Sequence, residues 1–400
     1  MAEKIVLAYS GGLDTSVAVK WMQEKHAAEV ITVTVDVGQQ EDLKQVEENS
    51  KKVGAVKHYS VDAKGEFVKD YVFRAIKANG LYEEKYPLSS ALSRPLIVNK
   101  LVDIARKEDA TALAHGSTGK GNDQVRFDIT IRSLAPDLKI VAPIREWNLS
   151  RDEEIKYAEK NGIPIPVDLD NPYSIDQNLW GRSIECGILE DPAHEPPEEI
   201  FEWTASPEKA PSEPEFISIG FDHGVPASVD GKKISPLEIV RTLNVKAGRH
   251  GVGRVDHMED RLVGIKSREC YECPAATVLL EAHKELEKTV LTRHELSFKH
   301  QVDAQWTFLA YAGLWMDPLR EDLEGFIDKT QERVTGEVKL KLYKGSATVV
   351  SRSSPFSLYD ANLATYNIET TFDQTWSPGF IEIWGLPTKA ANMLRNKGKR

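Results

Sequence analysis

The sequence predicts an α/β protein: a domain built on a parallel sheet, then an α+β domain and a C-terminal helical arm. Over residues 1–165, short apolar runs alternate with helical patterns, which is typical of a parallel sheet with helices on both faces. Val30–Val37 is rich in β-branched residues, as expected for a strand covered on both faces. From about residue 168, paired strands and long helices replace this alternation.

The elements of the first domain follow in a regular order. Strands are predicted at residues 5–8, 30–37, 56–61, 111–115 and 139–142. Helices are predicted at residues 17–24, 42–53, 65–78, 95–105 and 150–159. Gly54 and Gly80 follow two of these helices, as helix-ending glycines do. Pro95 is expected at the first position of its helix, where the missing N–H costs nothing, and Ser150–Glu153 resembles a capping box.

The second half of the chain begins with an irregular segment. Residues 192–214 hold six prolines among acidic residues and are expected to form a long extended loop. Strands are then predicted at 216–221 and 227–234, and a hairpin at 337–343 and 347–351 around Lys344-Gly345. Helical patterns cover 236–243, 275–290 and 301–327, a glycine-rich basic loop covers 246–254, and a short helix with a basic tail covers 387–400.

Composition excludes several classes of protein. Hydrophobic content of 41% and charged content of 28% are ordinary for a soluble globular protein, and no apolar run is long enough to cross a membrane. A net charge of −11 argues against a nucleic-acid partner, because phosphate binding needs positive charge. Three cysteines and no signal peptide favour a reducing cytoplasmic setting. Cys270 and Cys273 lack two further zinc ligands, so no metal site is expected there.

A small polar loop, Ser10-Gly11-Gly12, lies between the first strand and the first helix. This arrangement directs the free N–H groups of a helix start toward one point, which attracts phosphate. The Walker pattern is absent, and the Rossmann pattern lacks its third glycine, although Asp36 at the end of the second strand keeps a dinucleotide site conceivable. A plain strand-to-helix turn with an N-cap is the structural alternative.

A second polar loop, His115–Phe127, follows the fourth predicted strand. Three glycines separate a hydroxyl, an ammonium, an amide, a carboxylate and a guanidinium within a dozen residues. Because the carboxyl ends of parallel strands meet at one edge of a sheet, this loop is expected beside the phosphate loop. A surface loop with Asx-turns would use Gly, Asn and Asp in the same way, but binding residues concentrate on such strand-end loops.

These two loops carry a resemblance to a known family. Ser10-Gly-Gly-Leu-Asp-Thr-Ser16 resembles the pyrophosphate loop of the ATP pyrophosphatases, and with Gly119-Lys-Gly-Asn-Asp-Gln-Val-Arg126 it resembles the argininosuccinate synthases. Further matching stretches are 82–86, 94–95, 161–166, 171–174, 246–254, 266–268 and 271–272. The resemblance thus extends in order over nearly the whole chain.

The resemblance implies a Rossmann-like pyrophosphate-loop domain at 1–167, a synthetase and multimerisation domain at 168–362, and an oligomerisation arm at 363–400. It implies that ATP, with Mg²⁺ on its phosphates, activates the ureido oxygen of citrulline as a citrullyl-AMP. The amine of aspartate then expels AMP, giving argininosuccinate for arginine biosynthesis. A homotetramer is implied as well. The enzyme must chiefly align three substrates and neutralise the leaving pyrophosphate.

The resemblance also implies the site residues. The ATP site is expected at Ala8, Tyr9, Ser10, Gly11, Gly12, Leu13, Asp14, Thr15, Ser16, Val35 and Gly116. The citrulline site is expected at Tyr86, Asn122, Arg126, Ser174, Ser183, Glu259 and Tyr271. The aspartate site is expected at Thr118, Asn122 and Asp123. Asp14, Lys120 and Asp123 are the catalytic candidates, Lys120 for phosphate charge and Asp123 for orienting or deprotonating the aspartate amine.

Two positions depart from the family's pattern, and two other functions compete. Ala91 stands where a serine often meets citrulline, with Ser89 and Ser90 beside it, and Asp260 replaces a more usual asparagine. A tRNA-thiolating or tRNA-lysidine-forming enzyme would need a basic face, and the thiolating type a cysteine pair. A non-catalytic nucleotide sensor would not need the set Arg126, Glu259 and Tyr271.

Overall fold

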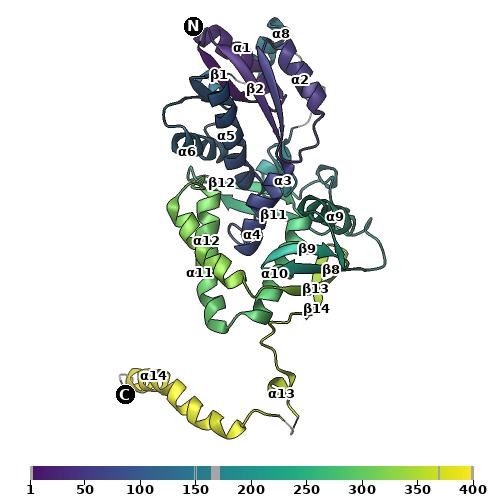
Figure 1. Ribbon diagram of the computed structural model, residues 1–400, viewed down its shortest axis with the longest axis vertical. Helices are drawn as coiled ribbons and strands as arrows, with labels where there is room; N and C mark the ends of the chain where they lie inside the picture. The colour runs from purple at the N-terminus through teal and green to yellow at the C-terminus, as the bar shows by residue number, and fades with distance from the viewer. Residues whose placement is uncertain (1–2, 148, 150, 164–171, 368–369, 398–400) are drawn as a thin grey trace. The chain divides into compact units, whose positions relative to one another are not determined.

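The computed structural model describes residues 3–147, 149, 151–163, 172–367 and 370–397 (Figure 1). The chain divides into two compact units, Met1–Phe356 and Ser357–Arg400, which are described in turn. The described part contains no helix that combines the length and the apolar character needed to cross a membrane.

The first unit begins with a parallel sheet in the order β3-β2-β1-β4-β5. Its strands are β1 (Lys4–Ala8), β2 (Glu29–Asp36), β3 (Lys57–Asp62), β4 (Ala112–Ala114) and β5 (Lys139–Val141), and every pair is parallel. The chain leaves β1 toward β2 on one side and returns to β4 on the other. The carboxyl ends of β1 and β4 therefore form a topological switch point, where such sheets bind ligands.

Helices cover both faces of this sheet, as the sequence predicts. Ile5 and Leu7 pack in one core cluster with α1 (Leu13–His26) and α8 (Arg151–Lys160). Val6, which points to the opposite face, packs in another cluster with α5 (Ser89–Lys107). The domain also contains α2 (Leu43–Lys52), α6 (Asp123–Leu134) and α7 (Pro143–Trp147).

Two helix predictions in this domain need correction. Helix α5 begins at Ser89, so Pro95 lies inside it and not at its start. The Tyr86 hydroxyl accepts hydrogen bonds from the amides of Ser90 (2.9 Å) and Ala91 (3.4 Å), which satisfies first-turn donors and extends the helix upstream. The predicted helix 65–78 is α3 (Lys64–Glu66), a π-helical turn η1 (Phe67–Val72) and α4 (Phe73–Lys77) in succession. Ser150 of the capping box lies outside the described residues.

Two antiparallel sheets follow. One has the order β10-β9-β8-β13-β14 and packs against α10 (Pro274–Val290). Its strands are β8 (Glu215–Asp222), β9 (Val225–Val229), β10 (Lys232–Lys233), β13 (Gly336–Tyr343) and β14 (Ser346–Ser353). The other has the order β11-β12-β7-β6 and consists of β6 (Ser174–Asn178), β7 (Gly181–Glu185), β11 (Arg254–Asp260) and β12 (Lys266–Glu272).

The second antiparallel sheet was not predicted from the sequence. The strands of this sheet carry few apolar residues, so the alternation that reveals strands is weak.

Three predicted boundaries are also wrong. The predicted strand 227–234 is interrupted at Asp230-Gly231, where both φ angles are positive. Helix α9 (Pro236–Arg249) includes the first four residues of the predicted loop 246–254. The helical pattern at 301–327 is two helices, α11 (Arg293–Tyr311) and α12 (Pro318–Gln331).

The proline-rich segment 192–214 is a long loop, as predicted, but it is less extended than expected. It contains the 3-10 turn η3 (Glu198–Ile200) and further turns at 192–193 and 207–209. The fully buried Glu272 carboxylate anchors it to β12, because it accepts hydrogen bonds from three successive amides at 202–204 (3.1, 2.8 and 2.9 Å). Arg182 of β7 donates to the same carboxylate at 3.0 Å. A single buried acid therefore fixes the course of this segment.

The second unit is a short helical arm. It contains α13 (Ala361–Ala364), η4 (Gln374–Trp376) and α14 (Ser377–Lys397). The predicted helix from residue 387 thus starts ten residues earlier, with Pro387 inside it. Seven large apolar side chains of α14 are exposed: Phe380, Ile381, Ile383, Trp384, Leu386, Met393 and Leu394.

Candidate active site

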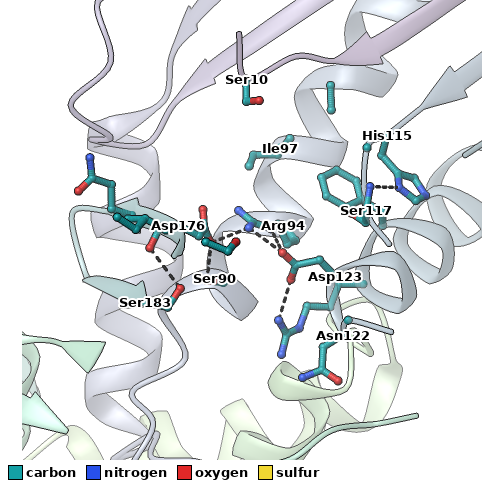
Figure 2. Close-up of a pocket in the computed structure, with 18 of the residues that line it drawn as sticks. Ser10, Ser90, Arg94, Ile97, His115, Ser117, Asn122, Asp123, Asp176 and Ser183 are labelled. Carbon is teal, nitrogen blue, oxygen red and sulfur yellow. Dashed lines mark hydrogen bonds and ion pairs between the residues drawn. The ribbon is translucent and has the colours of Figure 1, made fainter. Parts of the chain in front are cut away.

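A cavity of about 470 Å³ lies at the carboxyl ends of β1, β2 and β4 and is closed by the sheet β11-β12-β7-β6. Figure 2 shows Ser10 at one end of the cavity and Asn122 at the other, with Arg94 and Asp123 between them. The parallel sheet supplies the phosphate-loop end, and the antiparallel sheet supplies the opposite wall.

At the phosphate-loop end, the first turn of α1 has no side-chain cap, so its N–H groups remain available to an anion. Gly11 has φ +81°, a conformation that favours glycine. A Cβ on Gly116 would lie 3.1 Å from Thr15 Cγ2, so the second polar loop approaches the phosphate loop closely. The sequence predicts a phosphate site at this end, and the uncapped start of α1 together with the conformation of Gly11 suits phosphate binding.

The antiparallel sheet contributes through its two-residue period. Ser174 and Asp176 on β6, Ser183 and Glu185 on β7, and Glu269 and Tyr271 on β12 all line the cavity, whereas Ile184 and Cys270 between them pack in a core cluster. Alternate residues of a strand face opposite sides. On β7 and β12, one face is thus a polar wall of the site and the other is core, whereas on β6 Ile175 and Gln177 line the cavity as well.

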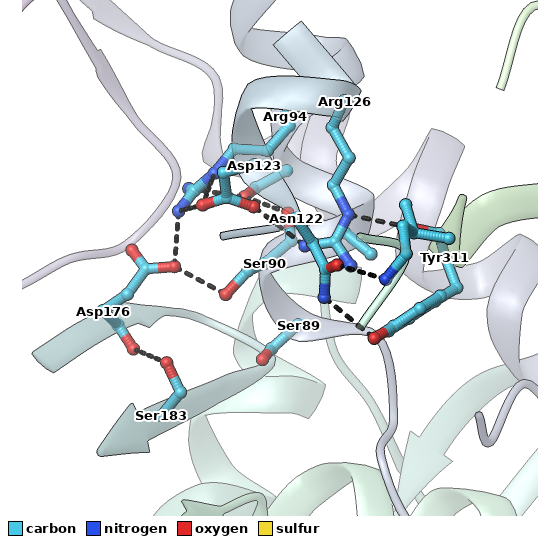
Figure 3. A network of polar contacts seen from close by, with 12 residues as sticks. Ser89, Ser90, Arg94, Asn122, Asp123, Arg126, Asp176, Ser183 and Tyr311 are labelled. Atoms are coloured by element: carbon cyan, nitrogen blue, oxygen red, sulfur yellow. Dashed lines mark hydrogen bonds and ion pairs between the residues drawn. The ribbon is translucent and has the colours of Figure 1, made fainter. Parts of the chain in front are cut away.

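The centre of the cavity holds an ion-pair network (Figure 3). Arg94 donates to Asp123 (2.8 and 2.7 Å) and to Asp176 (2.6 Å), and the Ser90 hydroxyl donates to Asp176 (2.5 Å). Arg126 donates to the other oxygen of Asp123 at 2.8 Å. Burial raises the pKa of Asp123, but the charges of Arg94 and Arg126 outweigh it and bring it to about 2. Asp123 is therefore an anion held by two guanidinium groups.

At the far end, the buried Glu259 carboxylate accepts hydrogen bonds from the hydroxyls of Tyr271 (2.5 Å) and Tyr311 (2.6 Å). Burial and then the charge of Glu259 raise the pKa of Tyr271 well above its usual value, so this hydroxyl stays a donor. The ring of Tyr86 stacks on that of Tyr271, with centroids 4.6 Å apart. These contacts make a rigid, acidic end of the cavity.

Arg126 is the buried cation of this end. Its Nε donates to the Tyr311 carbonyl at 2.9 Å and its Nη1 donates to Asp123. Its Nη2 is buried and has no hydrogen-bond partner among the described residues. A buried guanidinium group that is not satisfied by protein is suited to bind an anionic ligand group.

Most residues that the sequence assigns to the site line this cavity. They are Ala8, Tyr9, Ser10, Asp14, Thr15, Val35, Tyr86, Gly116, Thr118, Asn122, Asp123, Arg126, Ser174, Ser183, Glu259 and Tyr271. Gly11, Gly12, Leu13, Ser16 and Lys120 do not line it. Leu13 is core, the Ser16 hydroxyl bonds to Tyr9 (2.9 Å), and Lys120 is exposed.

Sequence reasoning missed several charged residues of the cavity. Arg94, Asp176, Glu185, Arg261 and Glu269 line it, and none was singled out as a site residue. Except for Arg94, they lie on or next to the unpredicted strands. At the departure from the family's pattern, Ala91 is buried and does not line the cavity, whereas Ser90 does.

The cysteines lie elsewhere. Neither Cys270 nor Cys273 lines the cavity, and burial, followed by the charge of Asp256, raises the pKa of Cys270 to about 12. A thiol with such a pKa is a poor nucleophile. The geometry therefore offers no support for thiol chemistry in this cavity.

Comparison with known proteins places the chain among close relatives. A family model described as "Arginosuccinate synthase N-terminal HUP domain" matches residues 4–164, and one described as "Arginosuccinate synthase C-terminal domain" matches residues 173–391. The argininosuccinate synthase of Pyrococcus furiosus is 59% identical over 392 residues, covering 98% of this chain and 95% of the relative. Those of Rubrobacter xylanophilus and Geobacillus thermodenitrificans are each 57% identical, covering 97% and 99% of this chain and 94% and 97% of the relatives.

Proposed function

The chain belongs to the argininosuccinate synthase family, and we propose that the cavity described above is where it performs the family's reaction. The enzyme ligates citrulline to aspartate with ATP, releasing AMP and pyrophosphate, in arginine biosynthesis. One observation supports this location above others. A single cavity joins the uncapped start of α1 to a buried Arg126 whose Nη2 lacks a partner among the described residues. One end suits phosphate and the other suits an amino-acid carboxylate.

For ATP, the residues Ala8–Ser16 with Val35 and Gly116 form the proposed site. The N–H groups at the start of α1, which no side chain caps, and the hydroxyls of Ser10 and Thr15 would hold the phosphates. Gly11, Gly12, Leu13 and Ser16 would contribute to the conformation of the loop, since none of these four residues lines the cavity. Val35 would contact the adenine from the end of β2.

The donor set at this end also fits Mg²⁺ that arrives with the nucleotide. Asp14 lines the cavity, and the described residues contain no cluster of three or more acidic, His or Cys side chains that could hold an ion alone. Mg²⁺ in nucleotide sites typically uses one or two carboxylates together with phosphate oxygens. When bound, the ion would neutralise charge on the departing pyrophosphate.

Citrulline is proposed to occupy the far end. The free Nη2 of Arg126 would bind its carboxylate, and Glu259, fixed by two tyrosine hydroxyls, would face its ammonium group. The remaining proposed contacts are Tyr86, Asn122, Ser174, Ser183 and Tyr271. Ser90, and not residue 91, would supply the hydroxyl on this side.

Aspartate is proposed to bind at Thr118, Asn122 and Asp123. Asp123 is a weak base because its pKa is about 2, so an orienting role for its carboxylate is favoured over proton abstraction. Lys120 remains a candidate for stabilising phosphate charge, although it is exposed outside the cavity wall.

At the level of the whole chain, we propose the division into 1–167, 168–362 and 363–400, with the last segment as an oligomerisation arm. A homotetramer is the proposed assembly, supported by the family and by the exposed apolar residues of α14. The cytoplasm is the proposed location, as for other enzymes of amino-acid biosynthesis.

The proposal is tested by measuring pyrophosphate and AMP with ATP and Mg²⁺ while citrulline or aspartate is omitted in turn. Over multiple turnovers, AMP and pyrophosphate are both expected only when citrulline and aspartate are present together. ATP binding without product under any combination would instead identify a nucleotide sensor, and product that requires RNA would identify a tRNA-modifying enzyme.

A further inference from the structure

Arg261, directly after β11, connects three parts of the cavity wall. Its Nη2 donates to Glu185 at the end of β7 (2.5 Å) and to Glu269 of β12 (2.8 Å), and its Nε donates to the Ser267 hydroxyl (2.8 Å). Its Nη1 donates to the backbone carbonyl of Lys120 at 3.3 Å. One side chain therefore ties the antiparallel sheet to the polar loop of the parallel-sheet domain.

The contacts of Arg261 distinguish it from a ligand-binding arginine. Four of its five N–H groups donate to protein oxygens, which leaves one for any other partner. Arg126, in contrast, keeps a buried Nη2 without a partner in the described part of the chain. The hydrogen bonds of Arg261 thus hold protein segments in place, whereas Arg126 keeps a donor that can bind a ligand.

The loop at 116–121 is held by side-chain contacts: Gln124 Nε2 of α6 donates to the Gly119 carbonyl at 2.5 Å, and the other contacts come from more distant segments. Within the described residues, no backbone–backbone hydrogen bond joins it to another segment. The segment after β11 holds it at two successive points: Arg261 at the Lys120 carbonyl, and the Leu262 amide at the Asn122 Oδ1 (2.8 Å). The amide group of Asn122 also donates to the Tyr311 hydroxyl at 2.8 Å.

We propose that Arg261 is a positioning residue for aspartate: it fixes the loop that presents Thr118, Asn122 and Asp123, and Glu185 and Glu269 hold its guanidinium group in place. This inference rests on the proposed function. It predicts a larger effect on the second chemical step than on the first. Activation of citrulline by ATP needs only Gly116 and Asn122 from this segment, whereas the second step also needs aspartate aligned by Thr118 and Asp123.

The test uses Arg261→Lys in the full-length enzyme. Lysine keeps the charge but has no planar fork to reach four partners at once. The KM for aspartate is expected to rise at least about tenfold, the change that loss of about 1.4 kcal/mol of alignment energy gives. Citrulline-dependent exchange of labelled pyrophosphate into ATP, measured without aspartate, is expected to fall by a clearly smaller factor than the one by which the KM for aspartate rises.

Arg268→Lys is the matched control. Arg268 lies on β12 and pairs with Asp256 (2.9 and 2.6 Å), but it does not line the cavity, so its variant should keep both quantities. Hydrogen exchange should show faster exchange at 116–122 in Arg261→Lys alone. An unchanged KM for aspartate, or an equal loss in the exchange reaction, would overturn the positioning role. A wild type without citrulline-dependent exchange or product would overturn the proposed function itself.

Discussion

At the residue scale, Arg126 is the buried cation on which citrulline binding is expected to depend. Arg126→Lys replaces the fork with a point charge and leaves the Tyr311 carbonyl or Asp123 with fewer donors. Loss of a charge-assisted hydrogen bond of about 2–3 kcal/mol predicts a KM for citrulline raised by about 30- to 160-fold. Steady-state kinetics measures this, with Arg106→Lys, whose partner is the surface residue Asp137, as the control.

Asp123 gives a prediction about pH. Its folded pKa of about 2 lies below its usual value of 3.8, so the stability it contributes is present above about pH 4 and is lost as the pH falls through about 2. Asp123→Asn is expected to lower kcat by about 10- to 100-fold through misalignment, without changing the shape of the pH–rate profile over about pH 6–9. Disappearance of an ionisation in that range would identify Asp123 as the base.

The pKa of Glu269 is shifted in the opposite direction to that of Asp123. Burial and the neighbouring Glu185 raise its pKa from 4.5 to about 8, despite the pairing with Arg261. Its contribution to stability is therefore present below about pH 4.5 and is lost as the pH rises through about 8. Glu269→Gln is expected to flatten the decline of Tm between about pH 6 and pH 9. Thermal melts at both pH values measure this, and an unchanged decline would contradict the raised pKa.

At the element scale, Glu272 determines the course of the proline-rich segment. Glu272→Gln removes the buried one of the two carboxylates that pair with Arg182. It also replaces one acceptor oxygen by a donor that faces the amides at 202–204. Breaking a buried ion pair costs about 3–5 kcal/mol, so a fall of that order in the free energy of unfolding is expected in urea titrations. Glu202→Gln removes the exposed partner of Arg182 and should cost less than about 1 kcal/mol. Equal effects of the two changes would contradict the anchoring role.

At the scale of the whole molecule, the arm Ser357–Arg400 is expected to contribute to the subunit interface of the proposed oligomer. Helix α14 buries none of its residues within its own unit, and Trp384 is 70% exposed. Trp384→Asp is expected to reduce the oligomer to a smaller species, because a charge would replace an aromatic anchor in the proposed interface. Analytical ultracentrifugation measures this. Asn392→Asp adds the same charge to the same helix and should leave the assembly intact, and an intact Trp384→Asp oligomer would rule out this role.

The sequence determined much about this protein. Strong local periodicity marked the five parallel strands, and the resemblance of ordered motifs identified the family and its reaction. A phosphate loop was predicted because glycine and hydroxyl residues between a buried strand and a helix are suited to bind an anion. These features are encoded by residues that are neighbours in the chain.

Other features were decided by the tertiary structure. The start of α5 at Ser89 depends on the Tyr86 hydroxyl, and Arg94 becomes part of the site only because Asp123 and Asp176 are brought to it from other elements. The strands that form the polar wall were missed, since a strand with a ligand-facing polar side lacks strong hydrophobic alternation. Local patterns report burial along one element, whereas ion pairs between distant residues and a wall facing a cavity arise only when the elements pack together.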